Sequence, residues 1–235
     1  MDSFAWLPAL LQTSDSLFPT GAYAHSGGLE TLVELGVVRD APSLAAFVRG
    51  HVIPSLERWE LPYLRFARES ALSGDLDGLA TLDREYGAAR LPRETRAASA
   101  QIGTQRLRTL LKVTPGNGVP WDTATRFQAL ITRREAAGHA AIVCGMQAAL
   151  LNVPVNAAGT AYFYGSVAGV CSAALKLIRI GQEGCQTVLA DALTLAEITV
   201  RASQEVPREE AGWCDPLWEI AAARHERAFA RLFIS

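Results

Sequence analysis

The chain contains four histidines, and their spacing decides whether a metal or catalytic site can be read from adjacent residues. They are His25, His51, His139 and His225. No two lie three or four positions apart, so no helical turn presents two imidazoles to one metal ion, and no His-Glu-x-x-His motif is present. No ligand set can therefore be read from adjacent residues, which leaves only a site assembled from distant segments or across a dimer. We expect no catalytic centre, no resident metal and no cofactor.

A polar, glycine-rich stretch surrounds His25 and lies between two apolar segments. Residues 14 to 30 read Ser-Asp-Ser-Leu-Phe-Pro-Thr-Gly-Ala-Tyr-Ala-His-Ser-Gly-Gly-Leu-Glu. Serine beside histidine suggests a hydrolase, but the Gly-x-Ser-x-Gly turn that exposes such a nucleophile is missing. We interpret residues 14–28 as a functional loop. Ser26-Gly27-Gly28 is typical of a helix start, and Glu30 then falls in the first turn, where the helix dipole stabilises a carboxylate.

Hydrophobic residues recur at helical spacing along most of the chain, and strand patterns are scarce. Leu44, Phe47 and Val48 share one helical face, for example. Pro54 and Pro62 are expected to kink or split the segment that follows. The sequence predicts helices from 42, at 75–87, from 92 to about 111, from 121, and at 139–151, 154–179, 182–203 and 218–232. We expect an all-α bundle of roughly eight to ten helices in a single domain spanning 1–235.

Composition narrows the class of protein. Hydrophobic residues make up 49% of the 235 positions and the net charge is −2, which argues against nucleic acid as the main partner. The N-terminus lacks a signal-peptide pattern, so we expect the cytoplasm. Residues 136–175 carry no Asp, Glu, Lys or Arg, but they are rich in Ala and Gly, so we expect two buried helices and not a membrane span. The four cysteines are widely spaced, three of them lie in apolar, Ala-rich surroundings, and we expect buried structural thiols in preference to metal ligands: Cys144, Cys171, Cys185 and Cys214.

Three surfaces are candidates for protein contacts. One is a basic helical region, which we expect to be either a solvent-exposed face or a binding surface for an acidic protein partner. It contains Arg84, Arg90, Arg93, Arg96, Arg106, Arg108 and Lys112. Small residues from Gly165 to Ala174 allow close helix approach, either in the core or for self-association. Lys176 and Arg179 end that helix and suit its dipole. The chain closes with Leu232 and Phe233 near its terminus, which predicts that the tail docks within the chain or on a partner.

Four stretches, in order along the chain, carry a family resemblance. The first is residues 10–36, containing the glycine-rich loop. The second is Arg93-Glu94-Thr95-Arg96-Ala97-Ala98-Ser99. The third combines Gly138-His139-Ala140 and Val143-Cys144-Gly145 with Ser172-Ala173-Ala174-Leu175-Lys176 and Ile180-Gly181-Gln182. The fourth is His225-Glu226 and the Arg-Leu-Phe-x-Ser ending. Together the four stretches resemble the UreF family of urease accessory proteins.

The resemblance implies an all-α, non-enzymatic scaffold that forms a homodimer. Such proteins bind the accessory protein UreD (UreH in some systems), recruit the GTPase UreG and dock on urease apoprotein, and they couple GTP hydrolysis to nickel delivery. Glu30 and Lys176 match positions associated with that coupling. The segment from about 206 to 235 is the expected partner-binding tail, and its end, Arg231 to Ser235, resembles the part that becomes ordered against UreD. The partner-binding residues we expect are Glu30, Lys176, Arg179, His225, Glu226, Arg231, Leu232 and Phe233.

Two other interpretations stay open at this point. One is an all-α enzyme that acts on a small molecule, with Glu30, His25 and His139 converging in a helical pocket. The other is a general interaction domain unrelated to nickel. The enzyme interpretation predicts buried, mutually hydrogen-bonded polar side chains, whereas the scaffold interpretation predicts Glu30 and Lys176 near a surface.

Overall fold

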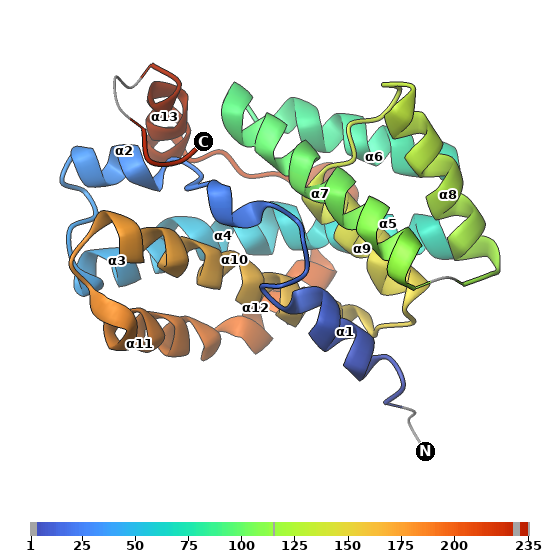
Figure 1. The fold of residues 1–235 in the computed structure, drawn as a ribbon, viewed down its shortest axis with the longest axis horizontal. Helices are drawn as coiled ribbons and strands as arrows, with labels where there is room; N and C mark the ends of the chain where they lie inside the picture. Colours follow the sequence, from blue (N-terminus) through green and yellow to red (C-terminus); the bar gives the residue numbers. More distant parts are fainter. Residues whose placement is uncertain (1–3, 115, 228–230, 235) are drawn as a thin grey trace.

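The computed structural model describes residues 4–114, 116–227 and 231–234, and this part of the chain contains helices and no strand. The predicted all-α bundle is confirmed (Figure 1). The α-helices are α1 (Leu7–Ser14), α2 (Leu29–Glu34), α3 (Ala41–Phe47), α4 (Ile53–Ser55), α5 (Leu61–Ser73), α6 (Leu76–Ala89), α7 (Arg93–Val113), α8 (Val119–Thr132), α9 (Ala140–Leu150), α10 (Val155–Leu177), α11 (Gly181–Leu193), α12 (Ala196–Glu205) and α13 (Pro216–His225). Short 3-10 turns form η1 (Ala22–Ala24) and η4 (Arg208–Glu210).

Residues 41–73 are helical throughout, so the two prolines do not split this segment. A π turn precedes each proline, η2 (Val48–Val52) before Pro54 and η3 (Leu56–Glu60) before Pro62. Proline has no N–H to donate and its ring pushes away the carbonyl four residues earlier, and a wider turn accommodates both effects. The carbonyl of Arg58, which Pro62 cannot bond, accepts the N–H of Gly212 at 2.9 Å.

The bundle has two main hydrophobic clusters. One contains Phe47 and Phe163 and unites α2–α4 with α10–α13. The other contains Phe66 and Phe127 and unites α5–α9. The helical segment 41–73 contributes to both. Gly145 of α9 packs so closely on α5 that an added Cβ would lie 2.2 Å from the carbonyl oxygen of Leu64, so glycine is required at this crossing.

Three predicted elements differ in detail. The helix expected at 182–203 is divided into α11 and α12, because the chain turns at Thr194 and Leu195. The last helix ends at His225 and not at 232. Of the two apolar helices, α9 is buried, but α10 keeps an exposed face that includes Gly165 and Gly169. Pro115, residues 228–230 and Ser235, which belong to the predicted loop and tail, lie outside the described residues.

None of the helices in the described ranges combines the length and apolar character needed to cross a membrane.

Candidate partner-binding site

Glu30 lies in the first turn of α2, directly after the glycine-rich loop. Gly27 and Gly28 have φ values of +62° and +94°, which side chains with a Cβ rarely adopt. A Cβ on Gly28 would lie 3.0 Å from the backbone and Cβ of Ala222. The glycine pair therefore starts α2, as predicted, and also lets α13 pack against its first turn (Figure 1). This packing brings Glu30 to the C-terminal end of α13.

The Glu30 carboxylate receives three hydrogen bonds from the C-terminal part of the chain. The N–H of Leu232 donates to Oε1 at 2.7 Å, and the N–H of Phe233 and Nε2 of His225 reach Oε2 at 3.2 and 2.9 Å. Burial disfavours the ionised form, but the donors from Leu232, His225 and Phe233 together hold the pKa of Glu30 below its usual value. Glu30 is therefore the acceptor around which the end of the chain is arranged.

Glu94 supplies a second carboxylate on the other side of His225. Its Oε2 lies 2.8 Å from Nδ1 of His225, and its Oε1 accepts from Nη1 of Arg231 at 2.8 Å. Arg93, its neighbour in the first turn of α7, pairs with Glu226 just beyond α13. We call α13 together with residues 231–234 the C-terminal unit. It is held between α2 and α7.

Lys176 joins the C-terminal unit to the glycine-rich loop. Its Nζ lies 3.6 Å from the centroid of the Tyr23 ring and 4.9 Å from that of Phe233. Both distances are within the range of cation–π attraction. The N–H of Ile234 also donates to the carbonyl of Ala24 at 2.9 Å. Phe233 is buried, so residues 231–234 dock within the chain.

The structure brings together most of the predicted site residues. The cluster contains Glu30, Lys176, His225, Glu226, Arg231, Leu232 and Phe233. Arg179 is exposed just beyond α10 and makes none of these contacts. Lys176 is exposed, as expected for a scaffold, but the expectation that Glu30 lies near a surface is wrong: its exposed fraction is 7%. The tail itself covers the carboxylate, which is why the helix-start pattern alone did not reveal its burial.

Glu94 and Tyr23 are site residues that sequence reasoning missed. Glu94 lies within a stretch used for the family resemblance, but its position at a helix start gave no reason to select it. Its role depends on the arrival of His225 and Arg231 from more than 130 positions away. Tyr23 belongs to the glycine-rich loop and is 70% exposed. Its place in that loop was the only sequence feature that could have identified it as part of the cluster.

The basic region predicted on α6 and α7 is largely engaged within the chain. Arg90 donates to Glu60 and to the hydroxyl of Tyr86. Arg106 donates to the carbonyl of Thr13 and to Gln147. These contacts favour a structural role for both side chains over an acidic partner.

The Gly138-His139-Ala140 stretch is explained by helix capping. Both oxygens of the buried Asp83 accept backbone N–H groups at the start of α9, from Ala137 at 2.6 Å, Gly138 at 3.0 Å and His139 at 2.8 Å. A carboxylate at a helix N-terminus is stabilised by the exposed N–H groups and the dipole. The N–H of Ala140 in turn donates to Ser99 of α7 at 3.3 Å.

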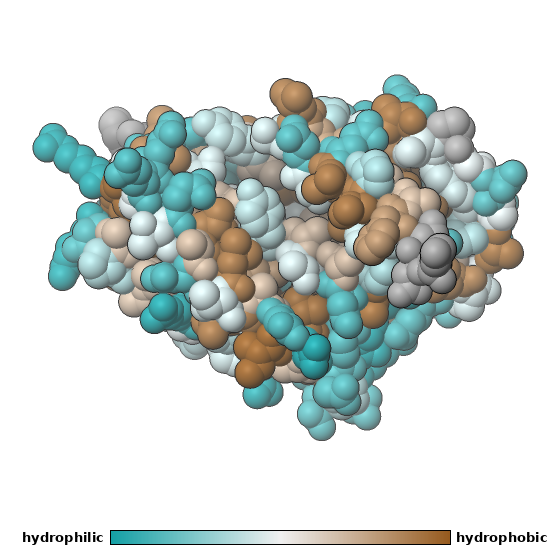
Figure 2. Space-filling view, turned by 90° about the horizontal axis from the view of Figure 1, so that it is seen from below, coloured by the Kyte–Doolittle hydropathy of each residue, from teal (hydrophilic) through white to brown (hydrophobic). Residues whose placement is uncertain are grey.

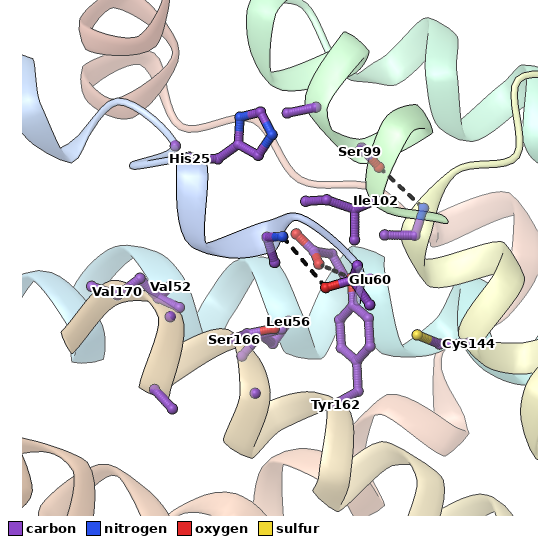
Figure 3. A pocket seen from close by; sticks show the side chains of 18 of the residues that line it. His25, Val52, Leu56, Glu60, Ser99, Ile102, Cys144, Tyr162, Ser166 and Val170 are labelled. Atoms are coloured by element: carbon purple, nitrogen blue, oxygen red, sulfur yellow. Dashed lines mark hydrogen bonds between the residues drawn. The ribbon is translucent and has the colours of Figure 1, made fainter. Parts of the chain in front are cut away.

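A cavity of about 800 Å³ lies beneath the glycine-rich loop (Figure 3). His25 of the loop, Ser99 and Ile102 of α7, and Ser166 and Val170 of α10 surround it. Figure 3 shows the hydroxyl of Tyr162 bonded to Glu60 inside it, at 2.6 Å. Burial raises the pKa of Tyr162, which keeps its proton available for this bond.

The enzyme interpretation is met in one respect, because Glu30 and His225 are buried and hydrogen-bonded to each other, but its three residues do not converge in this cavity. His25 lines it, but Glu30 and His139 do not. Glu30 is saturated by the C-terminal unit, and His139 is buried at the start of α9, where burial lowers its pKa to about 4. In the described ranges, no group of three or more His, Cys, Asp and Glu side chains is arranged to hold a metal ion.

The cysteines occupy different environments. Cys171 and Cys185 are buried together, and the Cys185 thiol donates to the carbonyl of Cys171 at 3.3 Å. Burial raises the pKa of both thiols, to about 12 for Cys171. Cys144 is partly buried and Cys214 is exposed. Cys171 and Cys185 are thus the buried thiols expected of cysteines in apolar surroundings.

Hydrophobic side chains are exposed over the docked tail. Leu232 and Ile234 are each 62% exposed, beside Tyr23. Figure 2 shows another face of the molecule, where hydrophobic residues form separate groups among hydrophilic ones.

Comparisons with known proteins agree with the resemblance seen in the sequence. The family model described as UreF matches residues 38–193. Curated relatives named "Urease accessory protein UreF" include those of Arthrobacter sp. (strain FB24), 33% identical over 97% of this chain and 96% of that protein, and of Paenarthrobacter aurescens (strain TC1), 32% identical over 97% of both. A relative from Bacillus sp. (strain TB-90) is 31% identical over 97% of this chain and 99% of its own. The family match covers more than half of the chain, and the relatives extend it to the segments that carry Glu30 and His225: the chain belongs to the UreF family.

Proposed function

We propose that the chain is a non-enzymatic accessory protein of urease maturation. The relatives bear the name urease accessory protein, and the candidate site consists of carboxylates engaged by donors within the chain. Such a site presents a shaped surface and offers no nucleophile to a substrate. Cytoplasmic location and nickel delivery to urease apoprotein are parts of the same proposal.

The C-terminal unit is the surface we assign to the partners UreD (or UreH) and UreG. The observation that carries this assignment is the docking of residues 231–234 on Glu30, which leaves the side chains of Leu232 and Ile234 exposed and joins Ile234 to Ala24, the neighbour of the exposed Tyr23. Aromatic side chains are enriched at protein interfaces, and grouped exposed apolar side chains mark such sites. A GTPase responds to a partner that binds one nucleotide state better than the other, which needs surface complementarity and no catalytic group.

The exposed small-residue face of α10 is the surface we assign to homodimer formation. Gly165 and Gly169 are exposed, and a Cβ on either would meet nothing within 4 Å in this chain. Such a face permits close approach of a second helix. It supports self-association over the core-packing alternative for these two positions.

Co-purification of the tagged chain with UreD and UreG, with GTP or GDP and with or without nickel, tests the proposal. A stoichiometric complex in which UreG joins only when this chain is present supports it. Urease activation is then measured with Glu30→Ala and Lys176→Ala, and with Glu34→Ala as the control, since Glu34 is exposed on the same helix as Glu30. Failure to bind either partner in every condition contradicts the scaffold role. Full urease activation by both Glu30→Ala and Lys176→Ala contradicts the assigned site residues but leaves the scaffold role standing.

A further inference from the structure

Both ring nitrogens of His225 face carboxylate oxygens. Nε2 lies 2.9 Å from Oε2 of Glu30, and Nδ1 lies 2.8 Å from Oε2 of Glu94. A neutral imidazole carries one N–H, so it donates at one nitrogen and presents a lone pair at the other. A lone pair facing a carboxylate oxygen at such a distance is repulsive, whereas an imidazolium donates to both oxygens. The arrangement therefore needs a proton on each ring nitrogen. This is one proton more than a neutral ring between two carboxylates carries.

The other donors around the two carboxylates keep both of them ionised. Glu30 also accepts the N–H groups of Leu232 and Phe233, and Glu94 also accepts the guanidinium of Arg231. Hydrogen bonds and cations of this kind favour the charged form of a carboxyl group. The additional proton consequently belongs on the ring of His225.

Each element around this imidazole carries charged groups, of which Glu30 and Glu94 contact the ring. The charged groups are Glu30 of α2, Glu94 and Arg93 of α7, Arg224, Glu226 and Arg227 at the end of α13, Arg231 of the tail, and Lys176 of α10, which lies over Phe233. Arg93 pairs with Glu226, and Arg231 pairs with Glu94. Among the described side chains, His225 is the group able to carry a positive charge that hydrogen-bonds Glu30. Within this contact, the charge on Glu30 is balanced only when both ring nitrogens of His225 carry a proton.

We propose that the charge of His225 closes the C-terminal unit. With two protons the ring bridges Glu30 on α2 and Glu94 on α7, and residues 231–234 dock; loss of one proton opens the unit. Glu30 transmits the change, because its Oε2 accepts from both His225 and Phe233. A carboxylate that turns away from a ring lone pair also leaves the tail amides. The unit is closed on the acidic side of this step and opens as the pH rises, and its use in partner binding rests on the function proposed above.

The variant Glu94→Gln keeps the contact between residue 94 and Nδ1 of His225 but removes the need for a proton on that nitrogen. In this variant the side-chain oxygen can still accept from Arg231, and the new NH₂ group replaces Oε2 and can donate to Nδ1 of a neutral ring. His225 then needs one proton to satisfy both neighbours. His225→Gln does the opposite: its amide donates to one carboxylate and presents an oxygen to the other at every pH. The double variant restores a donor for each acceptor.

The test is amide hydrogen exchange by NMR on the full chain, with protection factors of Leu232 and Phe233 followed from about pH 5 to about pH 8, the range in which histidine commonly changes charge. We expect protection to fall at least ~10-fold across this range in the natural protein and less than ~2-fold in Glu94→Gln. His225→Gln should be unprotected throughout, and the double variant should be protected throughout. The buried amide of Ile142 in α9 records whether the fold is intact. Nitrogen-15 shifts of the His225 ring count its protons directly.

Two results overturn the proposal. One is a ring with a single proton while Leu232 and Phe233 are protected. The other is protection that is equally pH-dependent in the natural protein and in Glu94→Gln. Partner binding is measured separately by the co-purification above. If exchange behaves as expected and partner binding does not follow it, the charge-dependent closure stands and the assigned partner surface fails.

Discussion

The ammonium group of Lys176 lies 3.6 Å above the centroid of the Tyr23 ring. Tyr23 belongs to the glycine-rich loop, Lys176 to the last turn of α10, and the same ammonium group reaches the ring of Phe233 in the tail. One exposed cation therefore links three segments that are distant in sequence. Its contribution to tail docking can be measured because the lysine is at the surface.

Replacing Lys176 by methionine removes the charge and keeps an unbranched side chain. Cation–π pairs at exposed sites contribute about 0.5–1 kcal/mol, so we expect a ~2- to 5-fold increase in exchange of the Ile234 amide. Lys176→Arg keeps a cation over both rings and is the matched control. Unchanged exchange in Lys176→Met would show that the tail docks without this contact.

Acid should release the tail through Glu30. The pKa of Glu30 is held below its usual value of 4.5 in the folded chain, so its stabilising effect is complete above that value and is lost as the pH falls through the lowered pKa. The measurement is the protection of the Leu232 amide during acid titration. In Glu30→Gln the amide should be less protected at neutral pH and should lack this acid step; an identical acid step in both proteins contradicts the assignment.

Gly28→Ala should displace α13 from α2. The new Cβ would lie 3.0 Å from Ala222, and the φ of +94° adds strain. We expect a loss of about 1–3 kcal/mol in the free energy of unfolding. Gly27→Ala is the control, because Gly27 also has positive φ but has nothing within 4 Å of an added Cβ. Urea denaturation of both variants separates steric overlap from backbone strain, and equal losses would remove the steric argument.

Asp83→Ala should destabilise the second hydrophobic cluster. It leaves three backbone N–H groups at the start of α9 without their acceptor, and we expect a cost of about 2–4 kcal/mol by urea denaturation. Asp83→Asn keeps one acceptor oxygen and should cost less. Asp77→Asn, at an exposed carboxylate on the same helix, should change stability by less than about 1 kcal/mol. If Asp83→Ala lowered the free energy of unfolding no more than Asp77→Asn does, the hydrogen bonds to Asp83 would contribute little to stability.

Local patterns predicted much of the secondary structure. The hydrophobic repeat led to the all-α class, and Gly27-Gly28 before Leu29 located the start of α2 and put Glu30 in its first turn. The same patterns misplaced the end of α13 and ran α11 and α12 together. Helical periodicity continues across Thr194 and Leu195 and across His225, whereas the turns at these places depend on what the neighbouring segments allow.

The composition of the site was partly predictable, and its geometry was not. Terminal apolar residues indicated a docked tail, and Phe233 is buried accordingly, yet its neighbour Leu232 points to solvent and contributes its backbone N–H. Nothing local to Glu94 distinguishes it from other carboxylates at helix starts. Its importance comes from the His225 ring and the Arg231 guanidinium, which the fold places against it.

By itself the sequence determined the helical class, the loop before α2 and the presence of a carboxylate at the start of that helix, because these depend on residues within a few positions of one another. Tertiary structure alone decided that Glu30 is buried and that His225 lies between it and Glu94. His225 is 195 positions from Glu30 and 131 from Glu94. This bridge forms because the packing of α13 against α2 and α7 brings the three side chains within hydrogen-bond distance. Local sequence patterns do not predict such a contact, because they report only on residues a few positions apart.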